Sequence, residues 1–370
     1  MGILKHLVLT GSLMLVAVTS MANPTFSSDK TDFRLETIAQ GLEHPWSLAF
    51  LPDGSMLVTE REGRLRMIRN GALLSTPISG LPELVVSGQG GLLDVILHPD
   101  FEQNQILFLS YAHRNRDGMT TRVARARLDG ERLTGVDVIF EALPRSNTSR
   151  HFAGRMEFDR EGNLYISVGD RGEMDRAQDN GDDAGGVHRI TTDGGPAPGN
   201  PFLDTSGVND TFYTTGNRNI QGMTIHPETG EIWSHEHGPR GGDEINIIRA
   251  GTDYGWPTIT FGIDYSGLPI TDDTEKEGMA QPLHYWDPSI APSGMAFYTG
   301  DLFPEWQGDL FVGALKMRKL VRLRIQGGEV TEEEDLLTDR IRDVRMGPDG
   351  ALWLLTDSPR GKVYRMVPLQ

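Results

Sequence analysis

The sequence predicts an all-β protein, a six-bladed β-propeller with four-stranded antiparallel blades. The main observation is a unit of strand, tight turn and strand that recurs six times along the chain. The units follow one another at intervals of roughly 45 to 75 residues, which is close to the length of propeller blades with loop insertions. No amphipathic helix of useful length separates them, and this argues against a parallel α/β sheet.

The first unit is residues 47–68, SLAFLPDGSMLVTEREGRLRMI, which reads as an alternating apolar strand, a Pro-Asp-Gly turn, a second strand, a polar turn and a third strand. Variants of this pattern follow at residues 94–113, 155–170, 222–238, 294–325 and 343–367. The 44 glycines and 21 prolines suit a turn-rich protein and are not clustered enough to indicate disorder. Two β-sandwiches are an alternative arrangement, but they explain the period less well.

The segment before the first unit has the composition of a secretory signal. A short basic start, an apolar run over residues 7–18 and a small-residue site ending at Ala22 predict cleavage after Ala22. The apolar run is too short for a good transmembrane helix, and the chain has no cysteine for a lipid anchor or a disulfide. We therefore expect a signal peptide over residues 1–22 and a single propeller domain over residues 23–370, periplasmic or secreted, without stable membrane insertion.

The charge of the chain excludes some partners. The formal net charge is -17, from 35 Lys and Arg against 52 Asp and Glu. A strongly acidic protein is repelled by nucleic acid and by anionic membrane surfaces, so neither is expected as the general partner. Basic residues that gather locally in such a chain need their own explanation.

Unusual polar residues lie in the loops beside the recurring units. They are Gln89, His151, Asp170, Arg218, Asn219, Gly238, Pro239, Glu244, Lys316, Arg340 and Arg342. In a propeller, loops from all blades converge at one end of the central channel, so these residues can meet in one cavity. Cations gathered there indicate a multiply anionic ligand. The plainer alternatives are that the lysine and arginines are solvated charges and that His151 merely caps a strand.

Several motifs in fixed order carry a resemblance to a known family. The motifs are GQGGLLD, HFAGR, GNRNIQG, HEHGPRGGDEIN, GTDYGWP and RIRDV, and the match runs from about Leu35 to Met366. The chain resembles the soluble aldose sugar dehydrogenases that use pyrroloquinoline quinone (PQQ), which are related to soluble glucose dehydrogenase. This resemblance implies a six-bladed, periplasmic, calcium-dependent oxidoreductase. It would oxidise aldoses at C1 to lactones with broad sugar specificity and pass electrons to an external acceptor.

The resemblance also implies roles for single residues. His151 matches the general base that takes the proton of the sugar C1 hydroxyl while hydride leaves C1 for the quinone C5. Arg218 matches the residue that faces the quinone oxygen and stabilises the charge developing there. The remaining matches are cofactor contacts at Asn219, Lys316, Arg340 and Arg342, and sugar contacts at Gln89 and Asp170, with Trp286 as a candidate for stacking on cofactor or sugar.

Two calcium sites are implied in the same way. The backbone carbonyls of Gly238 and Pro239 would be hard oxygen ligands for a calcium ion beside the cofactor. Glu244 and a backbone oxygen of Tyr254 match a second, structural calcium site. The chain departs from the glucose-type enzymes at Arg150, where they have an acidic residue, and this puts glucose selectivity in doubt.

Two other function classes remain open for the same architecture. A calcium-dependent lactonase would want a ring of carboxylate and asparagine side chains around the metal, and it would give the cations no ligand. A non-catalytic binding propeller would not need His151, Arg218 and the Gly-Pro turn to meet. The expected partners of the leading interpretation are a small aldose and the electron acceptor, with the protein a monomer or a homodimer.

Overall fold

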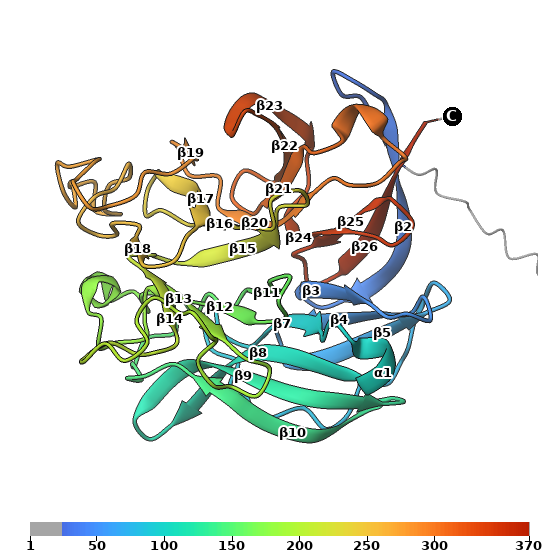
Figure 1. Cartoon of the computed structure of the whole chain (residues 1–370). Helices are drawn as coiled ribbons and strands as arrows, with labels where there is room; N and C mark the ends of the chain where they lie inside the picture. The colour runs from blue at the N-terminus through green and yellow to red at the C-terminus, as the bar shows by residue number, and fades with distance from the viewer. Residues whose placement is uncertain (1–23, 370) are drawn as a thin grey trace, which may run out of the picture.

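The computed structural model describes residues 24–369, and the predicted signal peptide lies outside this range. Its strands form six antiparallel sheets arranged in a ring (Figure 1). The six units of the sequence fall one in each sheet, so the predicted six-bladed propeller is confirmed. Within residues 24–369, no helix has both the length and the apolar character needed to cross a membrane.

Each blade is a meander of four antiparallel strands, numbered here from the central axis outward. Blade 1 comprises β3 (Pro45–Phe50), β4 (Met56–Glu60), β5 (Arg64–Arg69) and β6 (Ala72–Leu73). Blade 2 comprises β7 (Leu92–Leu97), β8 (Ile106–Asn115), β9 (Gly118–Asp129) and β10 (Arg132–Glu141). Blade 3 comprises β11 (Met156–Phe158), β12 (Leu164–Val168), β13 (Gly186–Ile190) and β14 (Phe212–Thr215).

The second half of the ring repeats this plan. Blade 4 comprises β15 (Ile220–Ile225), β16 (Ile232–Glu236), β17 (Asp243–Ile248) and β19 (His284–Trp286). Blade 5 comprises β20 (Pro292–Phe297), β21 (Leu310–Ala314), β22 (Lys319–Gln326) and β23 (Glu329–Leu337). Blade 6 comprises β24 (Ile341–Met346), β25 (Leu352–Thr356), β26 (Gly361–Pro368) and, from the other end of the chain, β2 (Phe33–Leu42).

Two blades carry a short fifth strand that the sequence pattern did not predict. The two-residue β1 (Thr25–Phe26) extends blade 6, and β18 (Thr252–Asp253) pairs in parallel with β14 of blade 3. The helices are single turns: α1 (Phe101–Asn104) and the 3₁₀ turns η1 (Met174–Gln178) and η2 (Pro304–Trp306). The pairing of β2 with β26 closes the ring, because it joins the first long strand to the last within one sheet.

The hydrophobic core is divided into layers between neighbouring blades. The second strand is buried along its whole length in five of the six blades: β4, β12, β16, β21 and β25. Such a strand is covered on both faces, which explains why its sequence reads as a nearly continuous apolar run rather than an alternating one. Burying each large aliphatic side chain stabilises the fold by about 1.5–3 kcal/mol.

Charged residues of the inner strands meet at the central axis. Arg155 lies 3.4 Å from Asp94 and 3.1 Å from Asp343, while Arg345 lies 3.0 Å and 2.8 Å from the same two carboxylates. The four residues come from blades 2, 3 and 6, and the two carboxylates compensate the two guanidinium groups. This network links non-adjacent blades below the cavity described next, because Arg155 also lies against the ring of Trp46, which lines that cavity.

Candidate functional site

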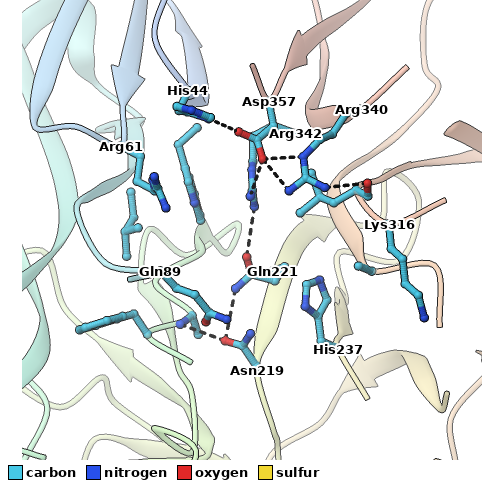
Figure 2. Close-up of a pocket in the computed structure, with 16 residues that line it drawn as sticks. His44, Arg61, Gln89, Asn219, Gln221, His237, Lys316, Arg340, Arg342 and Asp357 are labelled. Carbon is cyan, nitrogen blue, oxygen red and sulfur yellow. Dashed lines mark hydrogen bonds and ion pairs between the residues drawn. The ribbon is translucent and has the colours of Figure 1, made fainter. Parts of the chain in front are cut away.

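A cavity of about 390 Å³ opens at one end of the axis, and all six blades contribute to its wall (Figure 2). The side chains come from two kinds of position, the start of an inner strand and the residues just after a second strand. These positions meet because the two strands are antiparallel neighbours. The cavity is lined by His44, Trp46, Arg61, Gln89, Leu93, Phe152, Ala153, Asn219, Gln221, His237, Ala291, Leu315, Lys316, Arg340, Arg342 and Asp357.

The cavity is rich in cations although the protein is acidic. Its four basic side chains, Arg61, Lys316, Arg340 and Arg342, face a single lining carboxylate, that of Asp357. Asp357 is already engaged, since one oxygen lies 2.7 Å from His44 Nδ1 and the other 2.8 Å from Arg340.

The ionisation of Asp357 is determined by the residues around it. Burial alone would raise the pKa of Asp357, but the charge of Arg342 and the hydrogen bond from His44 lower it to about 2. Burial lowers the pKa of Arg342 to about 10, which leaves the guanidinium charged at neutral pH. The cavity therefore presents a fixed excess of positive charge.

His151 lies beside this cavity in a buried hydrogen-bonded pair. Its Nδ1 is 2.6 Å from Oδ1 of Asp170, whose other oxygen accepts a hydrogen bond of 2.8 Å from Trp256 Nε1. Because an ionised carboxylate only accepts, Nδ1 carries the proton of the neutral imidazole and Nε2 keeps its lone pair. Burial lowers the pKa of His151, although the hydrogen bond that its Nδ1 donates to Asp170 acts in the opposite direction. The imidazole is thus neutral near pH 7 and has one basic nitrogen available.

The charge of Asp170 is stabilised by the same contacts. Burial alone would raise its pKa, but the hydrogen bond and charge of His151 outweigh this and lower it. The backbone N–H of Gly172 adds a hydrogen bond of 2.6 Å to Oδ1. Both oxygens of Asp170 are occupied in this way, and the residue orients His151. Its contact with the sugar stays a prediction.

The backbone that carries His151 is in an uncommon conformation. His151 has φ of 48° and Ala153 has φ of 52°, both in the left-handed region that residues other than glycine rarely adopt. Gly169 permits this loop to approach β12, because a Cβ there would lie 2.2 Å from the carbonyl oxygen of His151. The side chain of Gln89 fixes the loop from the cavity side by accepting a hydrogen bond of 2.7 Å from the His151 N–H.

Arg171 clamps the same loop from the other side. Its guanidinium donates to the carbonyls of Arg150, at 2.5 Å, and Thr148, at 2.9 Å, and it lies 3.5 Å from the ring centroid of Phe152. The side chain is 2% exposed, and burial lowers its pKa to about 9. Because this buried arginine donates hydrogen bonds to two carbonyls of one loop, it holds that loop, and hence His151, in place.

Arg218 and Asn219 precede β15 and are held by a buried carboxylate. Glu236 accepts hydrogen bonds from the backbone N–H groups of Arg218 and Asn219, the latter at 3.3 Å. The Arg218 guanidinium donates to the carbonyls of His237 and Gly238, both at 2.9 Å, and its Nε is buried without a partner among the described residues. Asn219 Oδ1 accepts from the N–H of Ala153 at 3.2 Å, which joins this segment to the His151 loop.

A smaller cavity adjoins the first and shares His237 with it. Two glutamates line it, Glu236 and Glu244, which are directly opposite each other on β16 and β17. Burial, with the charge of Glu236, raises the pKa of Glu244 to about 8, as expected when two buried carboxylates share a site. Gly238 and Tyr254 line the same cavity. In the part of the chain that the structure describes, no three His, Cys, Asp or Glu side chains gather as a metal-binding group.

The structure brings most of the predicted site residues together. Gln89, Asn219, Lys316, Arg340 and Arg342 line the larger cavity, while Arg218, Gly238, Glu244 and Tyr254 line the smaller one. His151 and Asp170 lie beside the larger cavity rather than on its wall, and Pro239 follows Gly238 in the same loop.

Trp286 is a correction. It lies on the outermost strand of blade 4, 6% exposed, and its indole N–H donates to Glu333 of blade 5 at 3.0 Å. Its position opposite Asp243 on β17 places it between two blades, so it contacts neither cavity.

Other residues of the site were missed from the sequence: His44, Arg61, Gln221, His237, Trp256 and Asp357. Three of them stand inside motifs that were recognised: Gln221 in GNRNIQG, His237 in HEHGP and Trp256 in GTDYGWP. His237 is neutral, because burial lowers its pKa to about 3, and its Nε2 donates to the carbonyl of Pro292 at 2.6 Å. These residues were missed because a sequence motif does not show which of its side chains lie in the wall of a cavity.

Comparison with known proteins agrees with this architecture. The family described as glucose/sorbosone dehydrogenase matches residues 42–365. Aldose sugar dehydrogenase YliI of Escherichia coli is 43% identical over 366 residues, which cover 96% of this chain and 98% of the relative. The crystal structure of the soluble aldose sugar dehydrogenase from Escherichia coli in the apo form superposes with a TM-score of 0.88, at 43% identity, covering 91% of this chain and 100% of that chain.

A more distant solved structure extends the comparison. The PQQ-bound form of aldose sugar dehydrogenase from Streptomyces coelicolor has a TM-score of 0.74 at 27% identity, covering 93% of this chain and 100% of that chain. The family match spans all six blades and both cavities, from the last residue of β2 to the middle of β26. The chain belongs to the glucose/sorbosone dehydrogenase family.

Proposed function

We propose that the protein is an exported, single-domain, PQQ-dependent aldose sugar dehydrogenase that oxidises aldoses at C1 to lactones. The observation that carries this proposal is the neutral His151, oriented by Asp170, beside a cavity that has four cations and one engaged carboxylate. A base next to a polyanion-binding cavity suits proton removal from a sugar held against an anionic redox cofactor. The aldose sugar dehydrogenases among its relatives support the same reaction.

The cavity residues fit the cofactor. PQQ carries three carboxylates, and Lys316, Arg340 and Arg342 offer three cations on one side of the cavity. Arg342 and Arg340 are pre-oriented by Asp357, so little side-chain entropy is lost when an anion binds. When bound, PQQ supplies the acceptor for the hydride that leaves C1 of the sugar.

The proton of the C1 hydroxyl goes to Nε2 of His151. The reaction then balances, because the sugar loses one proton to the imidazole and one hydride, and the C1–O bond becomes the lactone carbonyl. Asp170 holds the Nδ1–H and stabilises the imidazolium that forms, and Trp256 holds Asp170. A base positioned in this way contributes about 100- to 10,000-fold to the rate.

Arg218 supplies positive charge at the smaller cavity, and its neighbour Asn219 lines the larger one. Its guanidinium is fixed by two carbonyls and lies 5.1 Å from the ring centroid of Trp256, the residue that also holds Asp170. A pre-positioned cation stabilises negative charge that develops during the reaction without reorganising. Trp256 thereby connects Arg218 to the pair formed by Asp170 and His151.

Calcium fits the smaller cavity. Glu236 and Glu244 face each other there, and two buried carboxylates repel unless a cation or a proton lies between them. The carbonyl of Gly238 opens on the same cavity and accepts from Arg218. Carboxylate and carbonyl oxygens are the ligands that calcium prefers, so Glu244, Tyr254, Gly238 and Pro239 are proposed to hold calcium ions here and beside the cofactor.

One experiment separates this proposal from its alternatives. The purified protein is loaded with PQQ and calcium, excess aldose is added, and reduction of the bound cofactor is followed in a single turnover, which requires no external electron acceptor. Reduction of the bound PQQ, with oxidation of the aldose at C1 to the lactone, supports the proposal. Lactone hydrolysis without PQQ would instead identify a lactonase, and absence of both reactions would leave a binding propeller.

A further inference from the structure

Two guanidinium groups near His151, one on the wall of the larger cavity and one on the adjoining loop, have no role in the proposed cofactor site. Arg61, just after β4, lines the cavity on the side opposite Lys316 (Figure 2), and Arg150 directly precedes His151. We propose that Arg61 and Arg150 form an anion subsite that selects aldoses carrying a carboxylate, with hexuronic acids as the preferred substrate class. The inference rests on the proposed function and narrows its substrate.

A short chain of contacts places both arginines around the base. Arg61 Nη1 donates to the carbonyl of Gly88 at 2.8 Å, and the N–H of Gln89 donates to the carbonyl of Ser149 at 2.9 Å. Gln89 Oε1 then accepts from the N–H of His151. Gln89 therefore connects the part of the cavity wall that holds Arg61 to the loop that carries His151.

Arg150 is exposed and its guanidinium forms no hydrogen bond or ion pair with any residue between 24 and 369. Its side chain lies over Gly172, where a Cβ would be 3.2 Å from the guanidinium Nε. Gly172 is also the residue whose N–H holds Asp170, the partner of His151. The charge of Arg150 is accordingly close to the base and is available to a ligand.

The charge of Arg61 is also only weakly compensated. Its ion pair with Glu62 is 3.1 Å long, and the two side chains are 30% and 29% exposed, so solvent screens it. The Nε of Arg61 is buried and has no partner among the described residues. The only carboxylate on the cavity wall, Asp357, is held by His44 and Arg340 on another side.

The bound cofactor does not account for these two charges. In the proposed cofactor site, the three carboxylates of PQQ would be matched by Lys316, Arg340 and Arg342, so Arg61 and Arg150 would remain without an anionic partner. In a hexuronic acid, C1 and the carbon that bears the C6 carboxylate are both bonded to the ring oxygen, so a cation that binds the carboxylate has to lie on the same side of the sugar as the base. Arg150, next to His151 in the chain, and Arg61, which contacts Gly88 beside Gln89, meet this requirement. A guanidinium group recognises such a carboxylate through charge-assisted hydrogen bonds.

The test compares substrates that differ only in charge. The enzyme loaded with PQQ and calcium is assayed at low ionic strength with glucuronate, with the uncharged glucuronamide of nearly equal size, and with glucose. We expect kcat/KM for glucuronate to exceed that for glucuronamide by about tenfold or more, mainly through KM, because each tenfold step requires only about 1.4 kcal/mol of binding. The preference should fall as salt is added.

Substitutions of Arg61 and Arg150 test whether these two residues cause the preference for glucuronate. Arg61→Gln and Arg150→Gln should each reduce the glucuronate preference, and the double variant should abolish it, with cofactor affinity unchanged. Arg249→Gln is the matched control, since this arginine is exposed and lies outside both cavities. Three results overturn the inference: equal kcat/KM for the charged and uncharged substrates, a preference that survives in the double variant, or lost PQQ affinity in Arg61→Gln, which would assign Arg61 to the cofactor. If neutral aldoses are oxidised without a preference, only this inference fails; if no aldose is oxidised, the proposed function fails with it.

Discussion

Nδ1 of His151 lies 2.6 Å from Oδ1 of Asp170, and the two residues belong to different loops of blade 3. The first prediction follows from the free Nε2 that this contact leaves. His151→Ala should retain fold, PQQ and calcium while kcat falls by about two to four orders of magnitude, since the base is lost and nothing else depends on it. Single-turnover reduction of bound PQQ measures the change. Normal reduction by the variant would remove His151 from the mechanism.

The second prediction concerns pH. Burial lowers the pKa of His151, and the neutral imidazole is the active base. We therefore expect kcat/KM to stay constant as the pH is lowered to 6.5, and to decrease only at lower pH, where the imidazole becomes protonated. In Asp170→Asn this decrease in kcat/KM should begin at a still lower pH, because the carboxylate whose charge and hydrogen bond raise the pKa of His151 is gone. The pH profiles of both proteins decide this, and a decrease that begins at higher pH in the variant would contradict it.

The third prediction tests the clamp on the His151 loop. Arg171→Met removes two hydrogen bonds to the carbonyls of Thr148 and Arg150, so kcat should fall by about tenfold or more while PQQ affinity is retained. Arg322→Met is the matched control: this arginine is equally buried, but it pairs with Asp309 in blade 5. The control should lower Tm without changing kcat. Equal effects of both variants on kcat per loaded molecule would make Arg171 a purely structural residue.

The fourth prediction distinguishes a calcium site from a mere pair of acids. With calcium bound, Glu244→Gln should lower Tm and calcium affinity, because a ligand is lost. After exhaustive chelation the same variant should be more stable than the parent protein, because the repulsion between Glu236 and Glu244 is relieved. Thermal unfolding of the parent protein and of the variant, each with and without calcium, gives the four Tm values to compare. A variant that is more stable in both conditions would rule out calcium at Glu244.

The fifth prediction ranks the cofactor cations. Arg342 has 12% of its side chain exposed, whereas Lys316 is an exposed residue of the cavity wall. Arg342→Ala should weaken PQQ binding by on the order of 3 kcal/mol, and Lys316→Ala by about 1 kcal/mol or less, since solvent screens exposed pairs. Titration of PQQ into each variant provides the affinities. If neither changes, the three carboxylates of PQQ are bound elsewhere.

The fold could be predicted from the sequence because every blade repeats the same local pattern. A strand, a Pro-Asp-Gly or equivalent turn and a buried second strand recur within residues 47–68 and again in each later blade. The short strands β1 and β18 could not be foreseen, because two residues have no periodicity to read.

The site was predictable where a residue stands beside such a repeat, as Gln89, Arg218 and Lys316 do. Arg171 and Asp357 were missed because their roles depend on partners in distant segments, the His151 loop for one and His44 for the other. The position of Trp286 could not be foreseen, because it stands on the outermost strand of its blade and the sequence pattern does not show how far a strand lies from the central axis.

The junction of β2 with β26 has a consequence for how the protein is made. Phe33 pairs with Pro368, so the sixth blade needs residues from both extremes of the chain. While the polypeptide is being synthesised from its amino end, β2 lacks its partner strand β26 until the strands of the five other blades have been made, so this edge is exposed throughout. Contacts of such long sequence separation fold slowly. The newly made chain therefore depends most on protection from aggregation just before its last strand emerges.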